Sequence, residues 1–449
     1  MSHVALQLLK IPETRNKIIA TMGLLLAYRV GFHVPIPGLS ASFLREQAHG
    51  GTAFGLLSAF SGGQLGQTVL FSLGIMPYIS ASIIFSILGK VSPQIEAIQK
   101  EGAAGQKKIN QWTRLAVVPI SFLQATMIWF GFFAKNPVFL ENREPTLGLM
   151  AVVVLGLMAG SLFVMWVGEL ITEHGIGNGA SLIIMAGIIS TMPASLSNVI
   201  KQQDDAYNTI LTLIGIWIAI VLVIVAIQKA ERRIPIQYAK LTRGRRVYGG
   251  QRHYLPLKIN MAGVMPIIFA SAVFIIPGVL LGFLASQTGW GFWSRLAAIF
   301  TDTDGFIYVT LSMGMVMGFS FFWNNLMFRP EEIADNLREH GSFIPGIRPG
   351  AKTAAYLKEV LTRITLAGAI FLAMIAVLPN FITGNIPGLS GNLAYFLGGT
   401  SVLIVVGVAL DVVDRMNAQL VMRNYEGFMK GKGGGMGGGM GGAGWAKRG

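Results

Sequence analysis

The feature that most constrains this chain is a series of long apolar runs separated by short polar segments. Each run approaches the roughly 20 residues that carry an α-helix across the hydrocarbon core of a bilayer. Only 12% of the residues are charged, against about 25% in an ordinary soluble domain. That is too little charge to cover a folded surface in water, and the 53% hydrophobic content excludes an intrinsically disordered chain.

The runs predict ten membrane-spanning helices. The first run is longer than the apolar stretch of a signal peptide and no small-residue cleavage site follows it, so we expect it to stay in the mature protein. The predicted spans are 18–37, 70–89, 115–133, 149–168, 181–199, 210–228, 264–284, 307–327, 361–379 and 394–412.

The basic residues indicate the orientation. Lys and Arg near the ends of spans are retained on the cytoplasmic side. One set of alternating segments holds 29 of the 35 Lys and Arg residues: 1–17, 90–114, 168–180, 229–258, 329–363 and 411–449. We therefore expect both termini to be cytoplasmic. The same basic loops could also simply contact anionic lipid.

Two cytoplasmic segments are too long to be mere connectors. Segment 229–258 has nine basic residues against one acid, and β-branched and aromatic residues around Gly249-Gly250 predict a projecting hairpin-like finger. Arg245 and Arg246 at its tip would suit bidentate contacts with ribosomal RNA or an acidic protein surface. The second, 329–363, balances six basic residues with five acidic ones, which favours a protein docking surface over a lipid-binding one.

The predicted membrane interior has few ionisable groups but several helix breakers. Backbone freed at such breaks must be buried in protein or line a wet cavity, so a water-filled path and ordinary kinked helices both remain open. Segment 50–70 is apolar but short and rich in glycine, so it could be a half-inserted element or an outer loop. The breakers are Gly74, Pro77, Pro119, Pro266 and Gly278.

Several stretches, in consistent order along the chain, carry a resemblance to a known family. They include YRVGFHVPIPG from Tyr28, FSGG from Phe60, LGIMPYISASII from Leu73, GELITEHGIGNGASLII from Gly168, ERRIPIQYAK from Glu231, ADNLREHGSFIPGIRPG from Ala334 and GGTSVLIVVGVALD from Gly398. The sequence resembles the SecY family, the central subunits of the bacterial protein-conducting channel. The resemblance extends from the first span to about Lys430.

The resemblance implies an all-α integral membrane protein with two five-helix halves, 18–199 and 210–412, related by inverted pseudo-symmetry around a central pore. A cytoplasmic segment, 1–17, would precede them, and a Gly-rich cytoplasmic tail, 413–449, would follow. The second half would carry large cytoplasmic loops at 229–258 and 329–360. A re-entrant plug would run over about 53–67 and include Phe60, Ser61, Gly62 and Gly63.

The resemblance also implies a waist lined by branched aliphatic side chains. An apolar constriction can close to ions by dewetting, yet it offers a passing peptide no charge to hold it. Ala180 is smaller than the residue usual at its position, which would thin the seal. The implied ring consists of Ile75, Ile79, Ala180, Ile184, Ile268 and Ile404.

A lateral gate would lie between the second and third spans on one side and the seventh and eighth on the other. We expect Pro77 and Pro266 to make two of these helices movable. A segment inside the channel could then partition into lipid according to its own apolarity.

The implied function is passage of unfolded secretory polypeptides across the bacterial plasma (inner) membrane and lateral release of transmembrane segments. The ribosome or the motor ATPase SecA would drive it, docking on Arg245, Arg246 and Arg348, while SecE and SecG would complete the complex. We expect no cofactor and no catalysis, because GxxxxGK[ST], HExxH and cysteine are all absent. The alternative is a secondary transporter with inverted repeats, although we find no midplane ion site.

Overall fold

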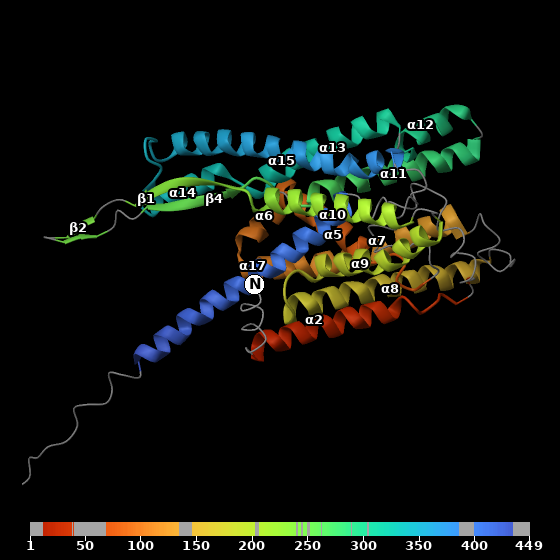
Figure 1. Ribbon diagram of the computed structural model, residues 1–449, viewed down its shortest axis with the longest axis horizontal. Helices are drawn as coiled ribbons and strands as arrows, with labels where there is room; N and C mark the ends of the chain where they lie inside the picture. Colours follow the sequence, from red (N-terminus) through yellow and green to blue (C-terminus); the bar gives the residue numbers. More distant parts are fainter. Residues whose placement is uncertain are drawn as a thin grey trace, which may run out of the picture.

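The computed structural model describes most of the chain. The described residues are 12–37, 39, 69–133, 146–202, 206–238, 241–243, 246–248, 252–261, 263–288, 290–302, 305–385 and 399–433. Most of them are helical, and most helices lie side by side along the long dimension of the molecule (Figure 1).

The first part of the chain forms α2 (Pro12–Gly31), α5 (Met76–Val91), α6 (Pro93–Lys100), α7 (Ala103–Ile128), a π-helix (Trp129–Phe133), α8 (Leu147–His174) and α9 (Gly179–Gln202). The second part forms α10 (Ala206–Lys229), α11 (Met265–Thr288), α12 (Gly291–Thr301), α13 (Phe306–Met327), α14 (Pro330–Glu339), α15 (Ala351–Asn385) and α17 (Gly399–Gly433). The strands are β1 (Glu231–Tyr238), β2 (Leu241–Arg243), β3 (Arg246–Tyr248), β4 (Arg252–Lys258) and β5 (Ser342–Phe343).

Each of the ten predicted spans overlaps one of these helices. Within the described residues, four stretches are long and apolar enough to cross a membrane: Leu147–His174, Leu211–Lys229, Phe306–Glu339 and Ala351–Leu378. A fifth is added if α5 and α6, which meet at a 95° bend, count as one broken span. The fold is therefore a bundle of apolar helices, and the full number of spans stays a prediction.

Several helices extend well past the apolar stretch that predicted them. α7 begins at Ala103, inside the segment predicted as a connector, and α15 begins at Ala351. α17 continues through Gly433, so the first part of the predicted tail 413–449 is helical. Hydropathy marks only the apolar part of a helix, and polar turns with favourable pairs, such as the ion pair between Arg415 and Asp411, can continue it.

Pro77 and Pro266 do not interrupt their helices as the sequence suggested, and their predicted role in the gate stays a prediction. Both lie in the first turn of their helices, α5 and α11, where a missing backbone N–H costs nothing because that group has no intrahelical partner. Gly74 precedes α5 with a positive φ of 53°. Pro119 and Gly278 lie within helices that continue past them. None of these five residues divides a helix.

The hairpin predicted in segment 229–258 is confirmed. β1 pairs antiparallel with β4 over seven positions, and β2 pairs with β3 up to Arg243 opposite Arg246. The chain therefore reverses between Arg243 and Arg246, ahead of Gly249-Gly250, and the β2 end projects from the helices (Figure 1). The other edge of β1 pairs with β5, so segments 229–258 and 329–363 share one sheet.

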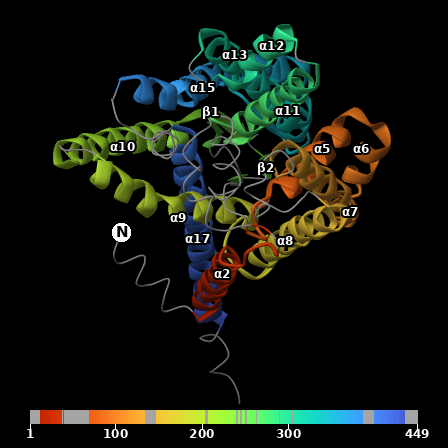
Figure 2. The ribbon, with the colours of Figure 1, turned by 90° about the vertical axis from the view of Figure 1, so that its right-hand side faces the viewer.

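The helices of each half surround their own apolar cores. Among the earlier helices, Ala125 of α7 and Trp129 of the π-helix pack with Val153 and Leu157 of α8. In the second half, a cluster around Leu372 and Leu403 joins α10, α11, α13, α15 and α17. Seen along the bundle, α5 to α9 and α11 to α15 form two groups, and α17, which contacts both α9 and α15, lies between them (Figure 2).

Glycines let the first-half backbones approach closely. A Cβ added at Gly179, the first residue of α9, would lie 1.8 Å from the carbonyl oxygen of Gly168 in α8. A Cβ at Gly160 would lie 2.0 Å from the carbonyl oxygen of Leu70. Because the obstacle is backbone in both cases, no side chain can move aside to make room. These glycines therefore hold α9 and the segment before α5 against α8.

We predict that Gly179→Ala destabilises the first half by roughly 1–3 kcal/mol, as overpacking does when a backbone must shift. The matched control is Gly215→Ala in α10, where an added Cβ meets nothing within 4 Å. Thermal unfolding in detergent should show a lower midpoint for Gly179→Ala alone. Equal midpoints would contradict the close approach.

Candidate functional site

Five of the six residues predicted for the ring belong to one apolar cluster. Ile75, Ile184 and Ile404 are buried in it, and Ile79 and Ala180 are partly buried against it. Four of them come from three helices that are far apart in the sequence, α5, α9 and α17, and Ile75 directly precedes α5. The cluster also contains buried side chains of α2 and α8.

A series of turns, rather than a preceding helix, leads the chain into the start of α5. Residues 71–75 form successive turns, and the positive φ of Gly74 allows the chain to enter α5 directly. The backbone N–H of Ile79 donates to the carbonyl oxygen of Ile75 at 3.1 Å, so the two residues lie one turn apart on the same face. Both side chains therefore reach the same apolar cluster.

The close approach of α8 and α9 sets the position of Ala180 and Ile184. A Cβ added at Gly168 would lie 3.3 Å from Cδ1 of both Ile75 and Ile183, and 3.7 Å from the backbone nitrogen of Ala180. The Thr172 hydroxyl accepts a hydrogen bond of 2.9 Å from the Gly179 backbone N–H, which fixes the first turn of α9. Sequence reasoning missed these two glycines, although their spacing around the α8–α9 turn was visible.

α17 brings the second half to the cluster through Ile404 and Val408, which are both buried. Ile268, the sixth predicted residue, lies in α11, and its side chain is outside the described residues. Val264, four residues earlier, packs against both this cluster and the second-half core. The start of α11 therefore lies beside the cluster.

A second apolar contact joins the two halves along α5. Ile83 and Ile87 of α5 pack against Phe269 of α11 and Trp323 of α13. The aromatic rings of Phe269 and Trp323 lie 5.3 Å apart between centroids. We call this contact the seam. The side chains that form it are hydrophobic, so their contacts with one another can separate without an ion pair being broken.

The remaining predicted residues lie elsewhere. Pro77 and Pro266 are both buried in the first turns of α5 and α11. Arg348 is exposed in the loop before α15, where its carbonyl oxygen accepts a hydrogen bond of 2.9 Å from the Thr353 hydroxyl. Arg246 begins β3, but its side chain lies outside the described residues, as do all of Arg245 and the predicted plug with Phe60, Ser61, Gly62 and Gly63.

Comparisons with known proteins agree with this arrangement. The sequence model of the SecY family matches residues 69–413. The protein translocase subunit SecY of Streptomyces coelicolor is 42% identical over 436 residues, which cover 94% of this chain and 98% of the relative.

Two solved structures share the fold. One, described as the structure of a protein conducting channel, has a TM-score of 0.64 at 19% identity and covers 91% of this chain and 93% of its own. Another, Sec61 in the canine ribosome-channel complex from the endoplasmic reticulum, has a TM-score of 0.60 at 18% identity with the same coverage. From its sequence identity and family match, this chain belongs to the SecY family.

Proposed function

We propose that this chain is the protein-conducting subunit of a translocase, a channel that passes unfolded polypeptides through a bacterial plasma membrane. The observation that carries the proposal is the convergence of Ile75, Ile79, Ala180, Ile184 and Ile404 from three helices into one apolar cluster. In this proposal Ile268 completes a ring with them. The alternative, a secondary transporter, is not favoured by membership of this family.

The chemistry of such a ring suits a channel that must pass many sequences. A closed apolar constriction excludes ions because water leaves it, and no charge or hydrogen bond in it retains a chain. Aliphatic side chains also adapt to different passing residues by changing rotamer. The channel therefore needs no catalytic group, and an external motor supplies the energy.

The two groups of helices act in this proposal as two halves, 18–199 and 210–412, with ten spans, inverted pseudo-symmetry and both termini in the cytoplasm. The seam between α5 and the pair α11 and α13 would serve as the lateral gate, since its contacts are apolar. A plug over 53–67 would stopper the ring in the resting state.

The finger and the loop before α15 would dock the cytosolic partner, a ribosome or the ATPase SecA. The canine Sec61 structure that shares this fold is a ribosome-channel complex. The sheet that joins the finger to β5 supports one continuous docking surface, with Arg245, Arg246 and Arg348 as its basic contacts. SecE, SecG and anionic lipid would contact the membrane-facing helices.

The proposed function is tested by reconstitution into liposomes with SecE, SecG and a motor ATPase. A precursor with a signal sequence should become protected from added protease, because it enters the vesicle lumen. A small-solute carrier would leave the precursor fully digestible, and that result would overturn the proposal.

The same assay tests the gate. The chain has no cysteine, so Ile83→Cys with Phe269→Cys can be joined by a short thiol crosslinker. The crosslinked channel should lose signal-sequence insertion, whereas each single variant treated with the same reagent should retain it. Unimpaired secretion by the crosslinked protein would refute this location of the gate.

We further predict that Ala180→Ile reduces ion leakage through a variant that lacks 53–67. The larger side chain adds apolar volume to the cluster that contains Ile184, so the constriction closes more tightly. Conductance in planar bilayers is the measurement. Equal conductance of the two plug-deleted proteins would mean that residue 180 is not part of the seal.

For the docking surface, Arg348→Glu should weaken binding of the motor or ribosome without changing insertion of the channel in the membrane. Reversal of a charge replaces attraction with repulsion at an exposed site, and the effect should shrink as salt is added. Arg295→Glu, an exposed arginine of α12 on the predicted opposite face, is the control. Equal loss of partner binding in both variants would argue against a specific surface.

A further inference from the structure

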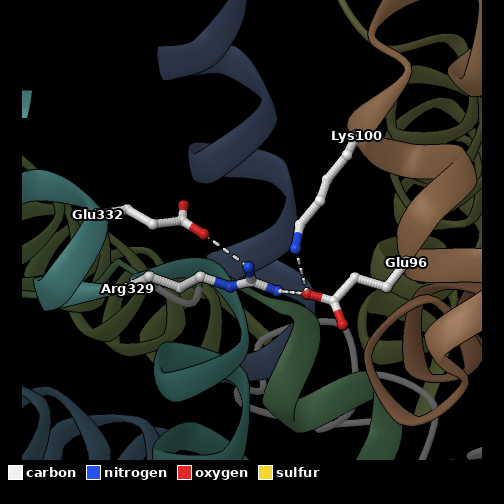
Figure 3. Close-up of polar contacts among 4 residues, drawn as sticks. All are labelled: Glu96, Lys100, Arg329 and Glu332. Carbon is white, nitrogen blue, oxygen red and sulfur yellow. Dashed lines mark hydrogen bonds and ion pairs between the residues drawn. The ribbon is translucent and has the colours of Figure 1, made fainter.

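A cluster of charged residues closes one end of the seam. α5 ends at Val91, and α6 begins at Pro93 after a 95° bend. α13 ends at Met327, and Arg329 caps the start of α14. Figure 3 shows Glu96 of α6 facing Arg329 across the gap between these two corners.

Arg329 contacts an acid on each side of that gap. Its Nη2 lies 2.9 Å from Oε1 of Glu96, and its Nη1 lies 2.6 Å from Oε1 of Glu332 (Figure 3). Lys100 Nζ lies 3.3 Å from the same oxygen of Glu96. The contact between Glu96 and Arg329 joins residues 233 apart in the sequence. Within the described residues, it is an ion pair that bridges the two groups of helices at the seam.

The pair is ionised and only partly screened. The side chains of Arg329 and Glu96 are 31% and 29% exposed. Hydrogen bonds from Arg329, and then from Lys100, hold the pKa of Glu96 below its ordinary value. The contact is therefore complete at any pH above the ordinary range of a glutamate, and weakens only as the pH falls through that lowered pKa.

Each charge also has a second partner on its own side. Lys100 follows Glu96 by four residues on α6, and Glu332 follows Arg329 by three. Both spacings place the side chains on the same helix face. When α6 and α14 separate, Glu96 keeps Lys100 and Arg329 keeps Glu332. Opening therefore breaks one ion pair without leaving an unpaired charge.

We propose that Glu96 and Arg329 form a latch at the end of the seam, and that its strength helps set how apolar a signal sequence must be to part α5 from α13. This inference rests on the proposed function, since it assigns specificity-determining residues to the proposed gate. Lys100 and Glu332 act in the opposite sense, because the contact across the gap holds Lys100 near Arg329 and Glu332 near Glu96, and separation relieves these like-charge repulsions.

The physical argument is a balance of free energies. A segment that enters the gate contributes favourable transfer free energy for each Leu, Ile, Phe or Val that reaches lipid. The hydrophobic contacts of the seam are ones that lipid can replace once it opens. The ion pair is a contact that lipid tails cannot replace, so its loss adds to the apolarity that a signal must supply.

The test compares two precursors in the reconstituted system, one with a full-strength signal and one with two signal leucines replaced by alanine. The readout is the ratio of weak-signal to full-strength translocation. Glu96→Gln and Arg329→Gln should each raise this ratio about two- to five-fold, the range expected for a partly exposed ion pair.

Variants of the local partners give a matched control with the opposite sign. Lys100→Gln and Glu332→Gln remove the like-charge repulsions that favour separation, so the ratio should fall below that of the wild type. Glu96→Arg combined with Arg329→Glu restores the pair across the gap but not the local pairs, and should also lower the ratio. A rise in all four single variants would indicate general loosening and would overturn the latch, as would an unchanged ratio in Glu96→Gln.

A second measurement needs no translocation. The chain has no cysteine, so spin labels can be attached to Ala97→Cys and Asn336→Cys, which are exposed on α6 and α14. In lipid nanodiscs, Glu96→Gln should broaden the distance distribution toward longer values, and Lys100→Gln should leave it no broader than the wild type. An unchanged distribution in Glu96→Gln would refute the latch.

The two failures can be told apart. If the full-strength precursor is not translocated by the wild type, the proposed function fails, whatever the label distances report. If that precursor is translocated normally while the ratio and the distances do not respond to Glu96→Gln, the proposed function stands and the latch alone is refuted.

Discussion

The structure depends on an apolar closure between helices that come from different parts of the chain. α5, α9 and α17 meet through Ile75, Ile184 and Ile404, whose contacts are dispersion and the exclusion of water. Such contacts have no fixed direction, so the helices can part and meet again without a particular hydrogen bond having to re-form. The same property gives a seal little selectivity for what passes. Stability of the closed state must therefore come largely from contacts elsewhere.

Those other contacts differ within and between the two groups of helices. Within the first group, Gly179 brings α9 so close to α8 that an added Cβ would lie 1.8 Å from the carbonyl oxygen of Gly168. Between the groups, the seam consists of larger side chains, Phe269 and Trp323, packed against α5. Close backbone packing resists sliding, whereas an interface of side chains can separate as a unit. The fold thus combines closely packed backbones within the first group with an interface of larger side chains between the groups.

Much of this was predictable from the sequence, because apolar length and the charge of loops are local properties. Each predicted span overlaps a helix, and the hairpin formed where β-branched and aromatic residues indicated it. The helix ends were not predictable from hydropathy, as the polar turns of α17 illustrate. Pro77 was misinterpreted because a proline inside an apolar run looks the same whether it breaks a helix or begins one. The pairing of Glu96 with Arg329 and of β1 with β5 left no local signal, since each depends on how distant segments fold together.

These two long-range contacts are joined by a short stretch of ordered chain. α14 starts directly after Arg329 and leads into β5, which pairs with the edge of β1 in the finger. Ala334 buries one face of α14, so this helix is packed against the body rather than free in solvent. α14 and the sheet therefore connect the finger and β5 to the charged corner of the seam. A partner seated on the proposed docking surface would therefore lie against the structure that carries one side of the proposed gate, through the continuous helix, turn and strand between Arg329 and Phe343.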